Sequence, residues 1–313
     1  MIKNIVSAVV VTLFLFSNAY AGQLAEPNAT VSTMRIISVT PTANAIYAIA
    51  SVEYPASWGN DIKFTVEING RPIRIRKVSG GFSGSTSMAD LMFFSKRAGR
   101  QNITVKTIVN GRNIQSKSSF DGKQTPFVAV MGHAGDREIL TGKDKLLIVA
   151  IANVMDVRIS FNGKDMYGKP SGSGDIQTRS LDSAWRRGKN VLTVSGNKFD
   201  GSLIVKNFTF IYLGEDSVLP LGETAIFYYG KEGSKSGPFY DVKVNGDALA
   251  TVRDVRTDRL SMDNDGWLIS DPMLGKELRA QKSGTATIQV FIKPHFLETM
   301  KLDRELTITV AEP

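Results

Sequence analysis

The sequence predicts an all-β protein of three tandem β-sandwich domains that follow a cleaved signal peptide. Three observations lead to this prediction. Short alternations of apolar and polar residues, typical of half-buried strands, follow one another after residue 33. No segment sustains the 3.6-residue period of an amphipathic helix. The order of strands and turns in residues 34–122 recurs in residues 123–212, which indicates an internal repeat.

The first 21 residues are typical of a secretory signal peptide. Lys3 is a short positive region, residues 5–16 are almost wholly apolar, and Ala19-Tyr20-Ala21 is a small-x-small cleavage site before Gly22. No later apolar run approaches the roughly 20 residues of a membrane span. We therefore expect an exported mature chain, periplasmic or at the cell surface, with no membrane span. Residues 22–33 are small and polar and predict a flexible lead-in.

The first predicted domain comprises residues 34–122. Asn69-Gly70 lies between two alternating runs and is a strong hairpin signal. Ile73 and Ile75 alternate with Arg74 and Arg76, which predicts a strand with both arginines pointing outward. Further strands are expected over residues 34–39, 45–54, 64–68 and 89–94. A Gly/Ser-rich loop is expected over residues 79–87.

The second predicted domain comprises residues 123–212 and repeats this order. Asn162-Gly163 matches the first hairpin turn, and a second Gly/Ser-rich loop follows at residues 171–174. Residues 181–210 predict two antiparallel strands between two turns. Because a Gly-containing turn precedes Asn102 in one copy and Asn190 in the other, we expect these two asparagines to occupy equivalent places.

These motifs resemble bacterial Ig-like or fibronectin-like modules, in which a Gly-x-Asn turn leads into the penultimate strand. The third domain, residues 213–313, is built differently. Its Gly284-Thr285-Ala286 motif and its closing Ile308-Thr309-Val310 resemble a group 2 bacterial Ig-like domain. The segment has extra residues near 254–278 and 293–300, which leaves its strand count open. Short linkers are expected near residues 121–125 and 213–216.

Signatures of catalysis and of metal or cofactor binding are sparse. The chain has no Cys, which excludes disulfides, thiolate metal sites and a Cys nucleophile. Its two histidines, His133 and His295, lie in different predicted domains, and no G-x-S-x-G motif is present. Asp263 and Asp265 resemble part of a calcium loop, although an Asp-Gly turn also explains them. We expect no enzyme activity and no cofactor, and calcium binding at these two residues stays open.

Charge is distributed unevenly along the chain. Residues 22–122 hold 12 Lys/Arg and 6 Asp/Glu, a net +6, and residues 123–212 hold 13 and 8, a net +5. Residues 213–313 hold 12 and 16, a net −4. Such asymmetry indicates a polyanionic partner, head-to-tail self-association, or no more than chance surface composition.

Basic side chains are the candidate ligand-binding residues. They lie on one predicted strand and on corresponding turns of the two repeats, and guanidinium groups pair well with carboxylate and phosphate. Charged turns also keep sheet edges apart, which is the alternative explanation. Nucleic acid is not expected, because these runs contain no interleaved aromatic residues. The candidates are Arg74, Arg76, Arg97, Arg100, Arg186, Arg187 and Lys189.

Three function hypotheses follow. The first is a non-catalytic exported structural or adhesive Ig-like array of the bacterial envelope or surface, with an envelope or surface protein as partner. The second is a carbohydrate- or polyanion-binding protein that uses the basic turns, with anionic polysaccharide as ligand. The third is an enzyme with paired acid and base carboxylates, such as a glycosidase. Trp58, Trp185 and Trp267, one in each predicted domain, would favour sugar binding if exposed, and otherwise fill the core or rim.

Overall fold

The computed structural model describes residues 33–42, 46–95, 97–141, 146–167, 169–171, 176–182 and 184–312. The predicted signal peptide, almost all of the lead-in and most of the loop at residues 171–174 lie outside these residues. The described part is built from β-strands, with one short 3₁₀ helix, η1 (Ala56–Trp58), and no α-helix. The predicted all-β class is therefore confirmed. Contacts divide the chain into two compact units.

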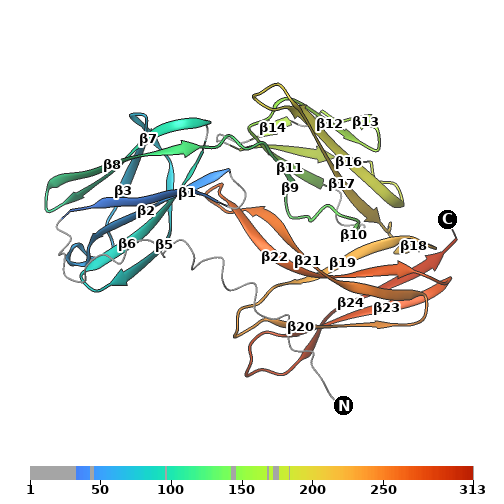
Figure 1. Ribbon diagram of the computed structural model, residues 1–313. Coiled ribbons are helices and arrows are strands. Elements are labelled where there is room, and N and C mark those ends of the chain that lie inside the picture. Colours follow the sequence, from blue (N-terminus) through green and yellow to red (C-terminus); the bar gives the residue numbers. More distant parts are fainter. Residues whose placement is uncertain are drawn as a thin grey trace, which may run out of the picture. The chain divides into compact units, whose positions relative to one another are not determined.

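The first unit holds most of the first sandwich (Figure 1). Its two sheets have the orders β1-β2-β6-β5 and β4-β3-β7-β8, which are the A-B-E-D and C′-C-F-G orders of an immunoglobulin-like sandwich. A buried cluster that includes Tyr54, Phe93 and Ile103 fills the space between the sheets. The strands are β1 (Arg35–Pro41), β2 (Tyr47–Pro55), β3 (Phe64–Ile68), β4 (Arg71–Ile73), β5 (Ile75–Ser83), β6 (Thr86–Phe94), β7 (Gly99–Val109) and β8 (Arg112–Gly122).

The second sandwich has the same strand order, which confirms the internal repeat. One sheet runs β14-β15-β11-β9, and β13-β12-β16-β17 form the C′-C-F-G side of the other. Between β9 and β11 the chain adds a three-residue strand, β10 (Glu138–Leu140), which pairs in parallel with β17. The remaining strands are β9 (Phe127–Val130), β11 (Leu146–Ala152), β12 (Met155–Phe161), β13 (Lys164–Asp165), β14 (Lys169–Ser171), β15 (Gln177–Asp182), β16 (Gly188–Asn197) and β17 (Leu203–Tyr212).

The third sandwich contains seven strands, which answers the strand count left open above. β18 pairs in parallel with β24 in the sheet β18-β24-β23-β20, and β19, β22 and β21 face it. The extra residues near 254–278 form a long hairpin of β21 and β22. The strands are β18 (Val218–Pro220), β19 (Thr224–Lys231), β20 (Phe239–Asn245), β21 (Leu249–Met262), β22 (Leu268–Ala280), β23 (Gly284–Lys293) and β24 (Lys301–Ala311).

β10 joins the second and third sandwiches into one continuous eight-stranded sheet. Its other edge meets β19 at the pair Glu138↔Ile226, so the order is β13-β12-β16-β17-β10-β19-β22-β21 (Figure 1). The hydrophobic core of the third sandwich also extends across this junction. Ile211, at the end of the second sandwich, and Leu213, directly after it, are fully buried within the core of the third. The two sandwiches therefore share one sheet, and Ile211 of β17 packs in the core of the third sandwich, while the second sandwich keeps a core cluster of its own.

The equivalence expected for Asn102 and Asn190 is wrong by one residue. The hairpin turns Asn69 and Asn162 each accept a backbone N–H from the facing F strand, at 2.9 Å. The donor is Asn102 in the first sandwich and Val191 in the second. Each donor lies three residues after the glycine of its turn, Gly99 or Gly188, so the two turns match in length and Asn190 occupies the place of Gln101, one residue before that of Asn102.

The loop expected over residues 79–87 is also wrong for most of its length. β5 and β6 continue through it as an antiparallel hairpin, and the pairs extend to Ser83↔Thr86. A Cβ at Gly80 would lie 3.0 Å from the carbonyl oxygen of Met88, so the small residues suit close pairing at the sheet edge.

Candidate functional site

The first pair of predicted basic residues lies at a crossover between sheets. The chain leaves β4 at Ile73 and begins β5, in the other sheet, at Ile75. Arg74 is exposed and Arg76 half-buried, whereas both isoleucines pack against the core. Arg74 therefore points outward as expected. The expected single strand through it is wrong, because the chain changes sheets at this residue.

Arg97 and Arg100 flank the E–F turn of the first sandwich, and both are exposed. Gly99 lies between them with φ +87°, a left-handed conformation that favours glycine. The guanidinium of Arg100 donates a hydrogen bond to Ser119 Oγ on β8, at 3.3 Å. The turn thus holds its cations in solvent at the start of β7.

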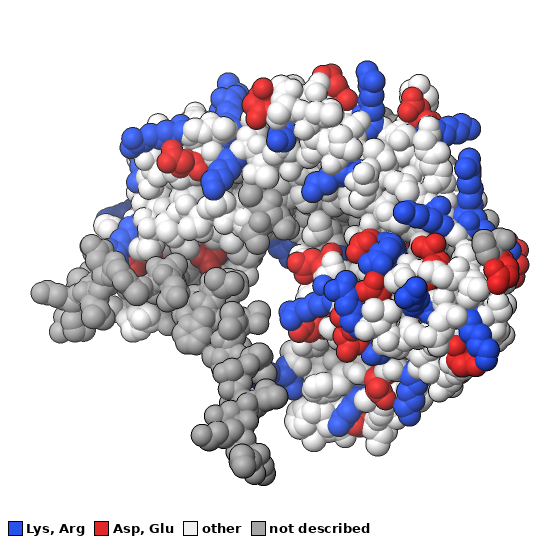
Figure 2. Space-filling model, turned by 45° about the vertical axis from the view of Figure 1, so that its right-hand side comes forward, with Lys and Arg blue, Asp and Glu red and all other residues white. Residues whose placement is uncertain are grey.

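Arg186, Arg187 and Lys189 lie together on the E–F turn of the second sandwich, and all three are exposed. Arg187 forms an ion pair with Asp216, an acidic neighbour that the sequence hypothesis did not include. This contact reduces the net positive charge of the turn. Acidic and basic side chains are also interspersed over the face of the molecule shown in Figure 2.

Asp263 shapes the turn between β21 and β22. Its Oδ1 accepts the backbone N–H groups of Asp265, at 3.1 Å, and Trp267, at 2.8 Å. These bonds give the Asp-Gly segment a turn role of the expected kind. Within the described ranges, no group of three or more His, Asp or Glu side chains is placed to hold a metal ion.

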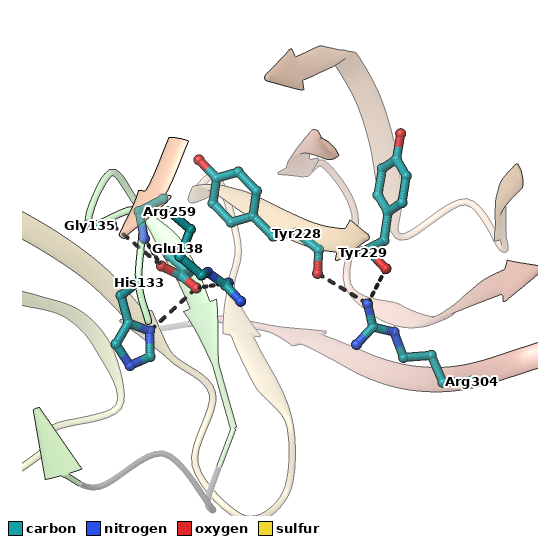
Figure 3. Close-up of polar contacts among 8 residues, drawn as sticks. His133, Gly135, Glu138, Tyr228, Tyr229, Arg259 and Arg304 are labelled. Atoms are coloured by element: carbon teal, nitrogen blue, oxygen red, sulfur yellow. Dashed lines mark hydrogen bonds and ion pairs between the residues drawn. The ribbon is translucent and has the colours of Figure 1, made fainter. Parts of the chain in front are cut away.

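The densest polar cluster lies where β10 joins the second and third sandwiches (Figure 3). Glu138 on β10 is almost completely buried, with 4% of its side chain exposed. One oxygen accepts from Arg259 at 2.7 Å and lies 3.4 Å from His133 Nδ1. The other accepts the backbone N–H groups of Ala134, at 2.7 Å, and Gly135, at 3.4 Å. Both carboxylate oxygens of Glu138 thus accept at least one hydrogen bond from the protein.

A second ion-pair cluster, around Glu277, lies at the same junction of the second and third sandwiches. Arg137, in the second sandwich, donates to Glu277 on β22 at 2.9 Å. Arg253 on β21 donates to the other oxygen of Glu277 at 2.5 Å. Arg137 therefore reaches an acid of the third sandwich, and Arg259 of the third sandwich reaches Glu138 of the second. The pairing across the junction is reciprocal.

These contacts keep both carboxylates ionised. Burial raises the pKa of Glu138, but the hydrogen bond and charge of His133, the charge of Arg259 and the Ala134 N–H lower the pKa by more. The hydrogen bond from Arg253 lowers the pKa of Glu277, and Arg137 adds to this effect against the cost of burial. Both groups are therefore anions near neutral pH.

A cavity of about 590 Å³ lies beside this cluster. His133, Glu138, Tyr228 and Arg259 line it together with Arg304, whose guanidinium donates to the carbonyl oxygens of Tyr228, at 3.4 Å, and Tyr229. Burial and the charge of Glu138 raise the pKa of Tyr228 to about 12, so its hydroxyl stays protonated. The arginines that line this cavity therefore already have partners in the protein, Arg259 with Glu138 and Arg304 with two backbone carbonyl oxygens.

Sequence reasoning missed this junction. Asp136-Arg137-Glu138 was not singled out, because a three-residue strand shows no periodicity and its partners lie more than 100 residues away at Arg259 and Glu277. One signal was present: a charged triplet directly before the apolar pair Ile139-Leu140. Such a triplet is unusual beside a buried strand unless the charges are paired.

All three tryptophans pack against a protein core or lie within the interior. Trp185 packs edge-to-face against Phe161, with ring centroids 4.9 Å apart, and against Phe210. Trp267 is buried. Trp58 is half-buried. Trp58 packs against the core of the first sandwich as Trp185 does against that of the second, so core or rim packing, one of the two expectations, is confirmed for all three.

No protein-family model and no curated protein matches this sequence. Among solved structures, latent PorU from Porphyromonas gingivalis aligns with 90% of this chain at 8% identity and TM-score 0.30, and the chain spans 34% of that protein. Titin Ig tandem domains align with 58% of this chain and 94% of theirs, at 14% identity and TM-score 0.25. The Bacteroides ovatus protein SGBP-B of a mixed-linkage glucan utilization locus, solved with a heptasaccharide, aligns with 88% of this chain and 67% of its own, at 12% identity and TM-score 0.19. Likeness at this level carries no information about function.

Across the described ranges, no helix has the length and apolar character needed to cross a membrane.

Proposed function

We propose that this chain is a non-catalytic, exported structural or adhesive protein of the bacterial envelope or surface. The observation that supports this proposal is the reciprocal pairing at the junction. The most elaborate polar cluster among the described residues connects two sandwiches, and its acids and bases form ion pairs across the junction, with the Nε of Arg259 as the one buried atom of these side chains that has no hydrogen-bond partner. Such a cluster holds the second sandwich against the third, which suits a structural role.

The charge state of the junction favours this role over an acid/base enzyme. A general acid near neutral pH needs a raised carboxyl pKa, so that it carries a proton to give. The pKa values of Glu138 and Glu277 are lowered instead. A glycosidase with either residue as its acid would have the wrong protonation state.

Activity assays on the mature chain test the proposal. Purified protein is incubated with glycoside, ester and peptide substrates beside a Glu138→Gln variant. We expect the same background rate for both proteins. Substrate turnover that disappears in the variant would overturn the non-catalytic role. Cell fractionation completes the test, because an exported envelope protein is found in the periplasmic, envelope or medium fraction, whereas recovery of the unprocessed chain in the cytoplasm would contradict export.

The exposed turns supply a second candidate function, the binding of an anionic envelope polysaccharide. Arg186 and Lys189 extend into solvent from a turn whose backbone is held by three hydrogen bonds to the side chain of Asn190. Turns held by a sandwich are common sites of binding residues. Since exposed pairs contribute only about 0.2–1 kcal/mol each, several cations must act together.

A five-residue substitution tests the basic turns. Changing Arg97, Arg100, Arg186, Arg187 and Lys189 to Ser should leave Tm nearly unchanged, because all five are exposed. Retention on envelope material in 0.1 M salt should fall, and 1 M salt should release the unaltered protein.

The matched control removes the same charge elsewhere, at five exposed cations outside these turns. Its retention should equal that of the unaltered protein. If the turn variant is retained as well as the unaltered protein, the turns do not bind the polysaccharide. Their charges then serve only to keep the turns soluble and the sheet edges apart. The control positions are Arg112, Lys117, Lys164, Lys206 and Lys235.

A further inference from the structure

The first sandwich carries a groove of about 750 Å³ on its C′-C-F-G side. Residues 58–63 of the B–C loop form one part of it, and β3, the end of β7 and the start of β8 supply the rest. This groove involves neither the basic turns nor the Glu138 junction. Its volume is that of a site for a small ligand or a short polymer segment.

The repeat shows that the fold does not require this B–C loop. Eight residues, 56–63, connect β2 to β3 in the first sandwich. Two residues, 153–154, connect β11 to β12 at the same place in the second. Both sandwiches nevertheless have the same strand order. The longer loop is therefore an addition to the module, and it brings Trp58 to the groove.

The apolar part of the groove includes Trp58 and Ile108, beside the half-buried Ile62 and Val109. Tyr54 stacks on Trp58 with ring centroids 6.2 Å apart and an angle of 24°, and this contact fixes the indole at the groove. Ile108 lies on the outward face of β7 and is 70% exposed. An indole beside an exposed aliphatic side chain offers the surface on which the C–H face of a sugar ring packs.

The polar part of the groove includes three asparagine side chains whose amide groups are available for hydrogen bonds to a ligand. Asn60, Asn110 and Asn113 line it, and among the described residues no side-chain hydrogen bond engages their amide groups. Each amide offers two donors and an acceptor, which suits the mixed donor and acceptor character of sugar hydroxyls.

The charges of the groove balance. Lys106 pairs with Glu67 at 2.5 Å, and Lys63 lies two residues from Asp61. The groove therefore lacks the excess positive charge that a polyanion requires. An extended apolar ligand, such as a lipid chain, would leave the three amides without partners.

We propose that this groove binds an uncharged oligosaccharide. Trp58 and Ile108 pack against its ring faces, and Asn60, Asn110 and Asn113 bond its hydroxyls. The proposal goes beyond the structural role, because it gives the array a specific contact with glycan at a site other than the basic turns.

Glycan binding by the full mature chain tests this proposal. The probes are neutral oligosaccharides of glucose, mannose, galactose and N-acetylglucosamine, with uronate and sulfated oligosaccharides beside them. We expect at least one neutral probe to bind, with the same affinity in 0.1 M and 1 M NaCl. If no neutral probe binds, or if binding is lost in 1 M NaCl, the proposal is wrong.

Three variants locate the site. Trp58→Ala, Ile108→Ser and the double variant Asn110→Gly/Asn113→Ala should each lower affinity tenfold or more. Ile108 is exposed, and Asn110 has φ +51°, where glycine is well tolerated, so the last two variants keep the fold even if Trp58→Ala does not.

Leu203→Ser is the matched control, because Leu203 is 66% exposed on β17 of the second sandwich. This variant and the five-residue turn variant should bind as the unaltered protein does. Binding that survives the groove variants, or that disappears with the turn variant, would overturn the assignment. Hydrolysis of the bound probe would contradict the non-catalytic role and leave the groove assignment intact.

Discussion

At the scale of single residues, Asn190 organises the E–F turn of the second sandwich. It is fully buried. Its Oδ1 accepts from Asn162 Nδ2, at 2.8 Å, and from the backbone N–H of Arg186, at 3.0 Å. Its Nδ2 donates to the carbonyl oxygens of Arg186, at 2.6 Å, and Gly188, at 2.9 Å. The asparagine thus ties the C–C′ turn and the E–F turn together.

Asn190→Ala should lower the free energy of unfolding by about 3 kcal/mol, because it leaves several buried groups without partners at about 1–3 kcal/mol each. Urea unfolding measures the effect. Asn207→Ala is the control, since Asn207 is exposed and bonds only to Thr193 among the contacts described for its side chain. It should change stability by less than about 0.5 kcal/mol. Equal effects of the two substitutions would contradict the assigned role.

Acid should destabilise the second and third sandwiches through Glu138 and Glu277. Their folded pKa values lie below the ordinary 4.5, so the unfolded chain binds protons more tightly. The stability that these groups contribute is complete above about pH 4.5 and is lost as pH falls through the lower folded pKa values. Urea unfolding between pH 7 and pH 3 measures this loss.

Glu138→Gln is the diagnostic variant for this pH dependence. The amide cannot titrate, so the variant should lose less stability on acidification than the unaltered protein does. It should also be less stable at pH 7, where Arg259 would face a neutral partner. An unchanged acid profile in Glu138→Gln would show that other groups control the pH dependence.

At the scale of elements, the sequence predicted the hairpin turns and strands that depend on neighbouring residues. Asn-Gly pairs specify hairpin turns, and apolar alternation specifies half-buried strands, so the repeat and the all-β class could be recognised. The Gly/Ser-rich residues 79–87 misled, because small residues favour loops on average but also fit an edge hairpin. β10 could not be predicted, since its three residues gain their structure from partners distant in sequence.

The candidate site residues likewise fall into those that local sequence could place and those whose contacts depend on tertiary packing. Arg97, Arg100 and Lys189 could be placed on turns because glycines mark those turns. The ion pair of Arg187 with Asp216 and the burial of Glu138 depend on tertiary packing, which has no local sequence signature. Composition suggested a polyanion site, whereas the three amides of the groove come together only when two segments that are distant in sequence, residues 58–65 and 106–113, lie side by side.

Ile139→Ser tests the role of β10. Ile139 pairs with Ile211 and packs against the core of the third sandwich. Losing this partly buried apolar side chain should cost about 1–2 kcal/mol. Hydrogen exchange should then be faster at the ends of both β17 and β19, which flank β10. Leu146→Ser is the control, because Leu146 is 56% exposed on β11. Faster exchange in only one sandwich would contradict the shared-sheet interpretation.

At the scale of the whole molecule, the module boundary in the sequence differs from the boundary of the folding unit. Residues 213–313 contain all seven strands of the third sandwich, β18 to β24. Their core nevertheless includes Ile211, and Ile139 packs against it. Glu277 and Arg259 pair with residues of the second sandwich. The first sandwich, by contrast, fills its core from residues 34–120 alone.

Fragments of the chain test this difference. A fragment of residues 213–313 should be unfolded or only marginally stable, because it exposes part of its apolar core and leaves Arg259 without its carboxylate. Residues 123–313 should fold and unfold in one cooperative transition, and residues 33–122 should fold alone as the control. The measurements are amide spectral dispersion and urea unfolding. If residues 213–313 give a dispersed spectrum and the same stability as in the longer fragment, the two sandwiches are independent, and β10 is a linker strand rather than part of a common core.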